Sequence, residues 1–170
     1  MEQKILLLIF FYLLNNSSAN VIDSVCKATQ DYKLCNESLA SNPNSANEDA
    51  KGLARIMLYM ALHKTTHIIV YVKRMIIENK FPDYRSVCED CLEACDKNYN
   101  FILHHFVLNA IKYFEVEMYH DATFAIGLSG LNVSTCADAC VNCNAFNLTN
   151  RSNEYAYFVL VVGDVIDYLY

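Results

Sequence analysis

The side chains with the most distinctive chemistry in this sequence are its eight cysteines, because their spacing repeats in mirrored order. Six of them form two sets with the patterns C-x2-C-x3-C and C-x3-C-x2-C, and the other two lie nine residues apart near the N-terminus. On two antiparallel helices with about 100° per residue, each cysteine of one set faces a cysteine of the other at the same height. The spacing therefore predicts a three-rung disulfide ladder and one local bridge, with the pairs Cys88–Cys143, Cys91–Cys140, Cys95–Cys136 and Cys26–Cys35.

Two other arrangements of these thiols fit the spacing. C-x2-C is a common spacing of zinc-binding thiolates. A partial ladder would leave the outer pair, Cys88 and Cys143, strained or free. An even number of cysteines in a secreted chain is more typical of disulfides than of zinc, so we expect disulfides and no metal ion.

The histidines are the second group that could carry chemistry. His63 and His67 lie four residues apart on one helical face, as the zinc ligands of H-E-x-x-H do, but this stretch reads H-K-T-T-H and lacks the glutamate. The adjacent His104 and His105 point about 100° apart on a helix. No G-x-S-x-G elbow or glycine-rich phosphate loop occurs, and bridged cysteines cannot act as nucleophiles. We expect no catalytic residue, no metal site and no cofactor, and hence no enzyme.

Residues 1–19 have the pattern of a secretory signal peptide. Lys4 gives a positive start, the apolar run from Ile5 to Leu14 is too short to span a bilayer, and small residues precede a cleavage site after Ala19. Residues 20–170 then form one domain. Secretion agrees with four candidate glycosylation sites of the N-x-S/T type, at Asn36, Asn132, Asn147 and Asn150. We expect a glycoprotein of the extracellular space.

Composition narrows the class of partner. With 54% hydrophobic and 19% charged residues the chain is globular rather than disordered. A net charge of -6 without a Lys/Arg cluster argues against nucleic acid. No later apolar run is long enough for a membrane span, and the Cys-Cys and Cys-x-Cys patterns of plant lipid carriers are absent. A protein partner remains, and the sequence does not determine the oligomeric state.

The elements that must position these residues are helices. Two prolines and four glycines are too few for a many-turned sheet protein. Two short helices are expected at 21–29 and 32–41. Apolar residues at helical spacing then predict a long helix from Asn47 to a break at 79–83, a helix with the first cysteine set that ends near 114, and, after a break at 115–118, a helix with the second set. A polar linker at 144–153 leads to a last helix at 155–169, where valines make a strand the alternative. The prediction is an all-α, up-down four-helix bundle with an N-terminal helical hairpin.

Several segments resemble the plant invertase and pectin methylesterase inhibitor family. The stretch VCKATQDYKLCNESLASNP at 25–43 is similar to the opening of this family, and DAKGLA at 49–54 is similar to the start of its long helix. Cys95-x3-Tyr99 resembles the third cysteine and the tyrosine that follows it. YHDA at 119–122 and STC at 134–136 resemble the hairpin tip and the fourth cysteine. The resemblance covers about 21 to 169.

The resemblance implies a four-helix bundle with an N-terminal hairpin and the disulfides Cys26–Cys35 and Cys95–Cys136. Members of the family block the active-site clefts of invertases or pectin methylesterases in the apoplast. The other four cysteines are additions to the family pattern. The Pro-Lys-Phe tripeptide that many invertase inhibitors carry at the hairpin tip is absent, because residues 115–119 read EVEMY. We therefore expect a secreted inhibitor of pectin methylesterase (pectinesterase), with an invertase inhibitor as the alternative and a non-inhibitory helical binding or structural protein as a further one.

An inhibitor needs an exposed surface, and the hairpin tip is the candidate. An exposed Met118–Tyr119 pair would be able to enter a cleft as an anchor, whereas a packed turn is the alternative. The candidate interface residues are Glu115, Glu117, Met118, Tyr119 and Asp121.

Overall fold

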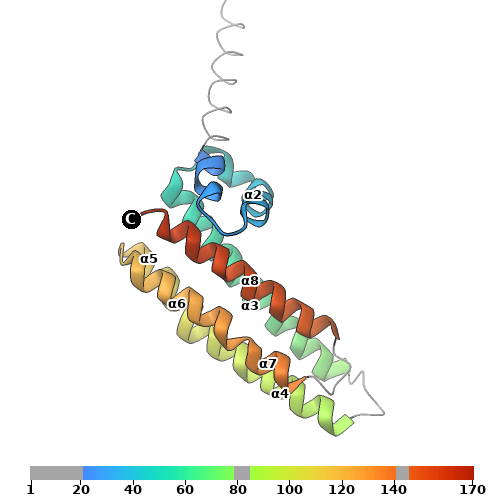
Figure 1. Cartoon of the computed structure of the whole chain (residues 1–170). Helices are drawn as coiled ribbons and strands as arrows, with labels where there is room; N and C mark the ends of the chain where they lie inside the picture. Colours follow the sequence, from blue (N-terminus) through green and yellow to red (C-terminus); the bar gives the residue numbers. More distant parts are fainter. Residues whose placement is uncertain (1–20, 79–84, 141–145) are drawn as a thin grey trace, which may run out of the picture.

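The computed structural model describes residues 21–78, 85–140 and 146–170, and all regular elements in these ranges are helical. Four predicted features lie outside the described residues: the signal peptide, the break at 79–83, the start of the linker at 144–153, and Cys143. Four long helical arms lie alongside one another in an elongated bundle, with a helical hairpin at one end (Figure 1). The predicted all-α bundle with an N-terminal hairpin is confirmed.

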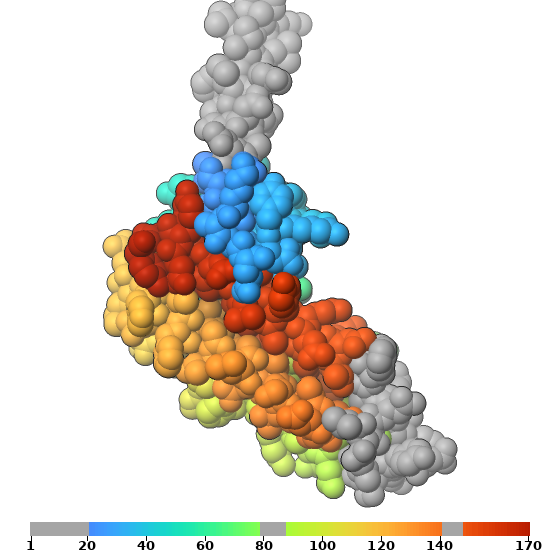
Figure 2. All heavy atoms as spheres, in the orientation of Figure 1, coloured from blue at the N-terminus to red at the C-terminus, as the bar shows by residue number. Residues whose placement is uncertain are grey.

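The N-terminal hairpin consists of the helical residues 21–27 and α2 (Tyr32–Ala40). Asp31 begins α2 by accepting a hydrogen bond from the backbone N–H of Leu34 at 2.9 Å, which is the usual role of aspartate at this position. Cys26 and Cys35 are joined in a disulfide. The backbone N–H of Gln30 donates to the Asp164 carboxylate at 2.8 Å and ties the hairpin to the last helix. Figure 2 shows the hairpin (blue) against the end of that helix (red).

The long helix α3 (Ala50–Glu78) begins three residues later than the sequence predicted. Asn47 is instead the last residue of a 3-10 turn, η1 (Pro43–Asn47). The cap is Asp49, whose carboxylate accepts the N–H of Gly52 at 2.8 Å. Both residues are favourable at a helix start, and the proline-initiated turn before Asp49 decides between them.

The second and third arms contain the cysteine sets. α4 (Arg85–Ile102) continues through a π-helical turn, η3 (Leu103–Val107), into α5 (Leu108–Glu115). The chain then turns back into α6 (Tyr119–Asn132) and α7 (Ser134–Ala139). The break predicted at 115–118 is confirmed, whereas the π-turn and the interruption at Val133 were not foreseen.

The last arm, α8 (Phe146–Asp167), is longer than predicted. The linker expected at 144–153 is wrong from Phe146 onward, and the alternative of a C-terminal strand is also wrong. The reason lies on one face of the helix: Leu148, Ser152 and Tyr155 are all buried, and the Tyr99 hydroxyl donates to the Ser152 hydroxyl at 2.9 Å. Ser152 is polar, but it lies in the core because it accepts the hydrogen bond of a buried tyrosine.

The core of the bundle contains a second set of buried hydroxyl groups that are hydrogen-bonded to one another. Thr65 donates to the Tyr155 hydroxyl at 3.0 Å, and Tyr155 donates to Ser129 at 3.1 Å, which links α3, α8 and α6. Such satisfied polar groups fix the register of packed helices. Among the described helices, none has the length and apolar character that crossing a bilayer requires.

Candidate functional site

The turn between α5 and α6, which we call the tip (residues 115–121), is closed by backbone hydrogen bonds. The N–H of Glu117 donates to the carbonyl of Phe114 at 3.0 Å, and the N–H of Met118 donates to the carbonyl of Tyr113 at 2.9 Å. This pair of bonds is the Schellman arrangement, which requires a left-handed residue after the helix. Glu117 takes that conformation with φ 62°, although it is not a glycine. The backbone of the tip is therefore a defined turn.

Two ion pairs fasten the tip to the first turns of α3. The Lys51 ammonium lies 2.5 Å from the Glu117 carboxylate. The Arg55 guanidinium donates two hydrogen bonds to Glu115, at 2.8 and 3.0 Å. Bidentate arginine–carboxylate pairs fix geometry as well as charge. The two predicted site residues Glu115 and Glu117 thus hold the tip in place, and their partners Lys51 and Arg55 were not foreseen because they lie about sixty positions or more away in sequence.

The apolar side chains that the tip offers to solvent are Val116, 61% exposed, and Met118, 46% exposed. Tyr119 was expected to be exposed with Met118, but it is only partly exposed, because its ring packs 5.4 Å from that of Phe114. Asp121 is exposed in the first turn of α6. The structure thus brings the five predicted residues together, and it adds Val116 as an exposed apolar side chain. Their role as an interface remains a prediction.

The ion pairs also set how the tip responds to acid. The hydrogen bonds from Arg55 lower the pKa of Glu115, and the hydrogen bond from Lys51 lowers the pKa of Glu117. A carboxylate with a lowered folded-state pKa contributes stability above its unfolded pKa of about 4.3 and loses it as the pH falls through the folded value. The tip therefore keeps both ion pairs in mildly acidic medium.

We expect Lys51→Met to raise the titration midpoint of Glu117 and to move that of Glu115 less, because Arg55 remains. The measurement is the carboxyl carbon chemical shift of each glutamate between pH 2 and 7. Lys97→Met, which removes a partner of Glu93 on α4, is the matched control and should leave both midpoints unchanged. An unchanged Glu117 midpoint in Lys51→Met would contradict the assignment.

The cysteines are paired as the spacing indicated wherever both partners are described. Cys91 is bonded to Cys140 and Cys95 to Cys136, with Cα separations of 5.0 and 4.6 Å. The two bonds stack, since the Cys95 and Cys140 sulfurs are 3.4 Å apart. Cys88 is also disulfide-bonded, whereas Cys143 lies outside the described residues.

The described residues contain one group with metal-ligand spacing, Cys91, Cys95 and Cys140, and all three sulfurs are in disulfides. None of these three sulfurs is therefore available as a thiolate ligand of a metal ion. His63 and His67 are exposed, with their rings 6.0 Å apart.

The candidate glycosylation sites differ in exposure. Asn150 is exposed, whereas Asn36 and Asn132 are only partly exposed. Asn132 also donates its amide to the carbonyl of Leu128 at 2.8 Å. The side chain of Asn147 lies outside the description. Asn150 is thus the described site best placed to carry a glycan.

Comparison with known proteins agrees with this architecture. Residues 20–157 match the family model described as plant invertase/pectin methylesterase inhibitor. A protein of Arabidopsis thaliana named "Cell wall / vacuolar inhibitor of fructosidase 2" is 33% identical over 79 residues, which are 46% of this chain and 44% of that protein. The match thus spans less than half of that relative. The crystal structure of a pectin methylesterase inhibitor from Arabidopsis thaliana aligns with a TM-score of 0.57 at 14% identity, over 84% of this chain and 94% of that one, which shows the same fold.

Proposed function

The chain belongs to the plant invertase/pectin methylesterase inhibitor family, and from this premise we propose that it is a secreted inhibitor of a pectin methylesterase in the plant cell wall. The family is one of enzyme inhibitors rather than enzymes. The observation that carries the proposal is the tip: a turn held by two ion pairs to α3, with Val116 and Met118 exposed between carboxylates. A fixed turn with an apolar end loses little conformational entropy when it enters a cleft.

The charge of the tip favours pectin methylesterase over invertase. The substrate of pectin methylesterase is a polymer of galacturonate, so the cleft of this enzyme must accept a chain that carries carboxylates. A glycoside hydrolase such as invertase instead uses a pair of carboxylates at the reacting bond. Arg55 and Lys51 balance the charges of Glu115 and Glu117, whereas Asp121 is exposed beside the tip without an ion pair to a described residue, and its carboxylate would be repelled there. The lysine of Pro-Lys-Phe, which would suit such a cleft, is absent.

Invertase is the second candidate target, and one observation favours it. The relative that is 33% identical over 79 residues is named an inhibitor of fructosidase. The same name agrees with a cell-wall or vacuolar location, and we propose the cell wall because of the predicted signal peptide at 1–19 and the candidate glycosylation sites.

The test is inhibition of a plant pectin methylesterase and a cell-wall invertase side by side. The protein is produced in a secretory host with its own N-terminal segment. Inhibition of the esterase alone supports the proposal, and inhibition of the invertase alone overturns the choice of target. If several enzymes of both classes keep full activity, inhibition as the function is wrong.

The tip is tested in the same assay with substitutions of its exposed apolar residues. We expect Val116→Ser with Met118→Ser to raise the inhibition constant at least about tenfold, since anchors of this kind are each worth about 1 kcal/mol or more. Leu131→Ser is the matched control, because Leu131 is 71% exposed on α6 outside the tip. Equal inhibition by all three proteins would exclude the tip as the interface.

A further inference from the structure

Lys64 interrupts the apolar spacing of α3, and the structure places it at the junction of three surface hollows. Its ammonium lies 4.8 Å from the ring centre of Phe158. Among the described residues it forms no ion pair. A lysine held over an aromatic ring without a carboxylate is available to an anionic ligand.

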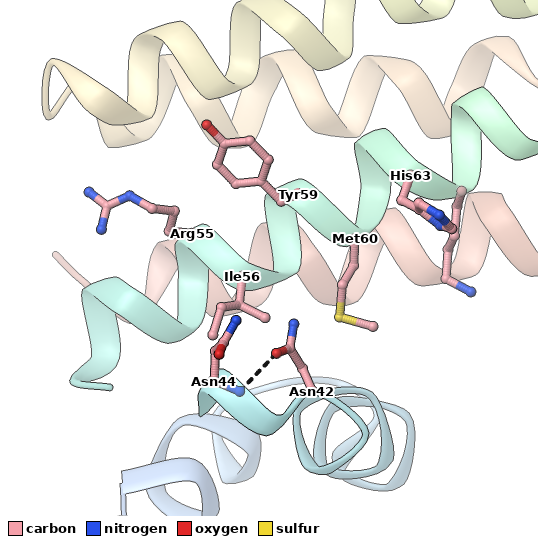
Figure 3. A pocket seen from close by; sticks show the side chains of 8 residues that line it. Asn42, Asn44, Arg55, Ile56, Tyr59, Met60 and His63 are labelled. Atoms are coloured by element: carbon pink, nitrogen blue, oxygen red, sulfur yellow. Dashed lines mark hydrogen bonds between the residues drawn. The ribbon is translucent and has the colours of Figure 1, made fainter. Parts of the chain in front are cut away.

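The first hollow, of about 510 Å³, lies between η1 and α3. Asn42 and Asn44 lie on one side of it and Ile56 and Met60 on the other (Figure 3). The Asn42 side-chain oxygen accepts the backbone N–H of Asn44 at 3.0 Å. The two side-chain amide groups make no other hydrogen bond with described residues, so they remain free to bind a polar ligand.

The second hollow, of about 230 Å³, adjoins the first through His63 and Lys64. Arg151 of α8 lines it, with its guanidinium 4.5 Å from the ring centre of Tyr71 and no ion pair to a described residue. Glu154 is the carboxylate among the lining residues. In a chain with a net charge of -6, this hollow thus has two cations against one carboxylate, whereas the third hollow also has Asp31 and Glu37 among its lining residues.

We propose that the two hollows together bind an oligosaccharide that carries a carboxylate, a hexuronate. Lys64 and Arg151 bind the carboxylate, because a guanidinium donates two parallel hydrogen bonds to such a group. The amides of Asn42 and Asn44 bind hydroxyl groups, since each amide both donates and accepts. The volume of the first hollow, about 510 Å³, lies in the range of small-ligand sites. Galacturonate and glucuronate oligomers share this chemistry.

Arg55 lines the first hollow and also holds Glu115 of the tip, but the two residues that we propose to bind the carboxylate take no part in the tip. Lys64 lies nine residues along α3 from Arg55, a rise of about 13 Å, and Arg151 lies on another helix. Substituting them leaves both ion pairs of the tip in place. Failure of saccharide binding with normal inhibition would therefore reject this site alone, and failure of inhibition would not affect it.

The test is calorimetric titration of the secreted protein with a galacturonate trisaccharide, a glucuronate-containing tetrasaccharide and neutral maltotriose. We expect saturable binding of the first or of both uronates, and none of maltotriose. Lys64→Gln and Arg151→Gln should each weaken binding about tenfold, or about 1.4 kcal/mol. Lys97→Gln, an exposed lysine on α4, is the matched control and should bind as the wild type does.

The outcomes separate the sources of the ligand and can overturn the proposal. Binding of galacturonate alone indicates a pectin-derived ligand, and binding of both uronates supports a general hexuronate site. Equal binding of maltotriose excludes recognition of the carboxylate. An equal loss of affinity in Lys97→Gln would exclude the two hollows as the binding site. Changes in backbone amide chemical shift on adding the ligand that lie outside residues 42–44, 55–68 and 151–158 would exclude them as well. Absence of any saturable binding also rejects the proposal.

Discussion

Replacing Cys91, Cys95, Cys136 and Cys140 together by alanine is expected to lower the free energy of unfolding by about 5 kcal/mol. The two bonds span sequence separations of 49 and 41 residues and are both buried. Closing a loop of that size removes about 4 kcal/mol of unfolded-state entropy, and the second bond then closes a ring of about ten residues worth nearly 3 kcal/mol. The disulfide of Cys88 stays and keeps part of this constraint. A loss of about 5 kcal/mol is close to the whole stability of many domains.

The measurement is urea unfolding followed by circular dichroism at 222 nm. Removing the local bridge with Cys26→Ala and Cys35→Ala is the comparison, because that bond spans nine residues and should cost only about 3 kcal/mol. A quadruple variant that unfolds at the wild-type urea concentration would show that the ladder does not stabilise the bundle.

The spacing of the cysteines made an important part of the fold predictable from the sequence. The mirrored spacing fixes the direction and register of α4 and α7, since a ladder demands antiparallel helices with matched heights. The α5–α6 break was visible because Glu115 and Glu117 interrupt the apolar pattern. The π-turn at Leu103–Val107 was not visible, because its residues are as apolar as a regular helix requires. The start of α8 was missed because Ser152 is polar and yet buried against Tyr99.

For the site, sequence reasoning located the tip but not what holds it. The positive φ of Glu117 has no signature, because glycine is the residue that normally marks such a position. Lys51 and Arg55 look like solvent-facing charges on α3, and only the fold brings them to the tip. Lys64 was visible as an intrusion in an apolar stripe. Its meaning depends on Phe158 and Arg151, which come from a helix more than eighty residues away.

The contact between α6 and α8 depends on a glycine. A Cβ added to Gly130 would lie 2.7 Å from Val159 Cγ2 and 3.3 Å from the carbonyl oxygen of Ala156. Val159 is fully buried and Ala156 contributes backbone, so neither can easily move. A Cβ added to Gly127, three residues earlier on the same helix, would have no neighbouring atom within 4 Å. Substitutions at the two glycines therefore allow the effect of close helix packing to be measured apart from the effect of helix propensity.

We expect Gly130→Ala to lower the free energy of unfolding by about 1 to 3 kcal/mol, because the methyl group must push α6 away from α8. Gly127→Ala should instead raise it by about 0.4 to 1 kcal/mol, because alanine loses less chain entropy on folding and meets no neighbour. Urea unfolding of both variants measures the opposite signs directly. If Gly130→Ala were as stable as Gly127→Ala, the helices would have room to separate, and the close approach of α6 and α8 would not be a requirement of the fold.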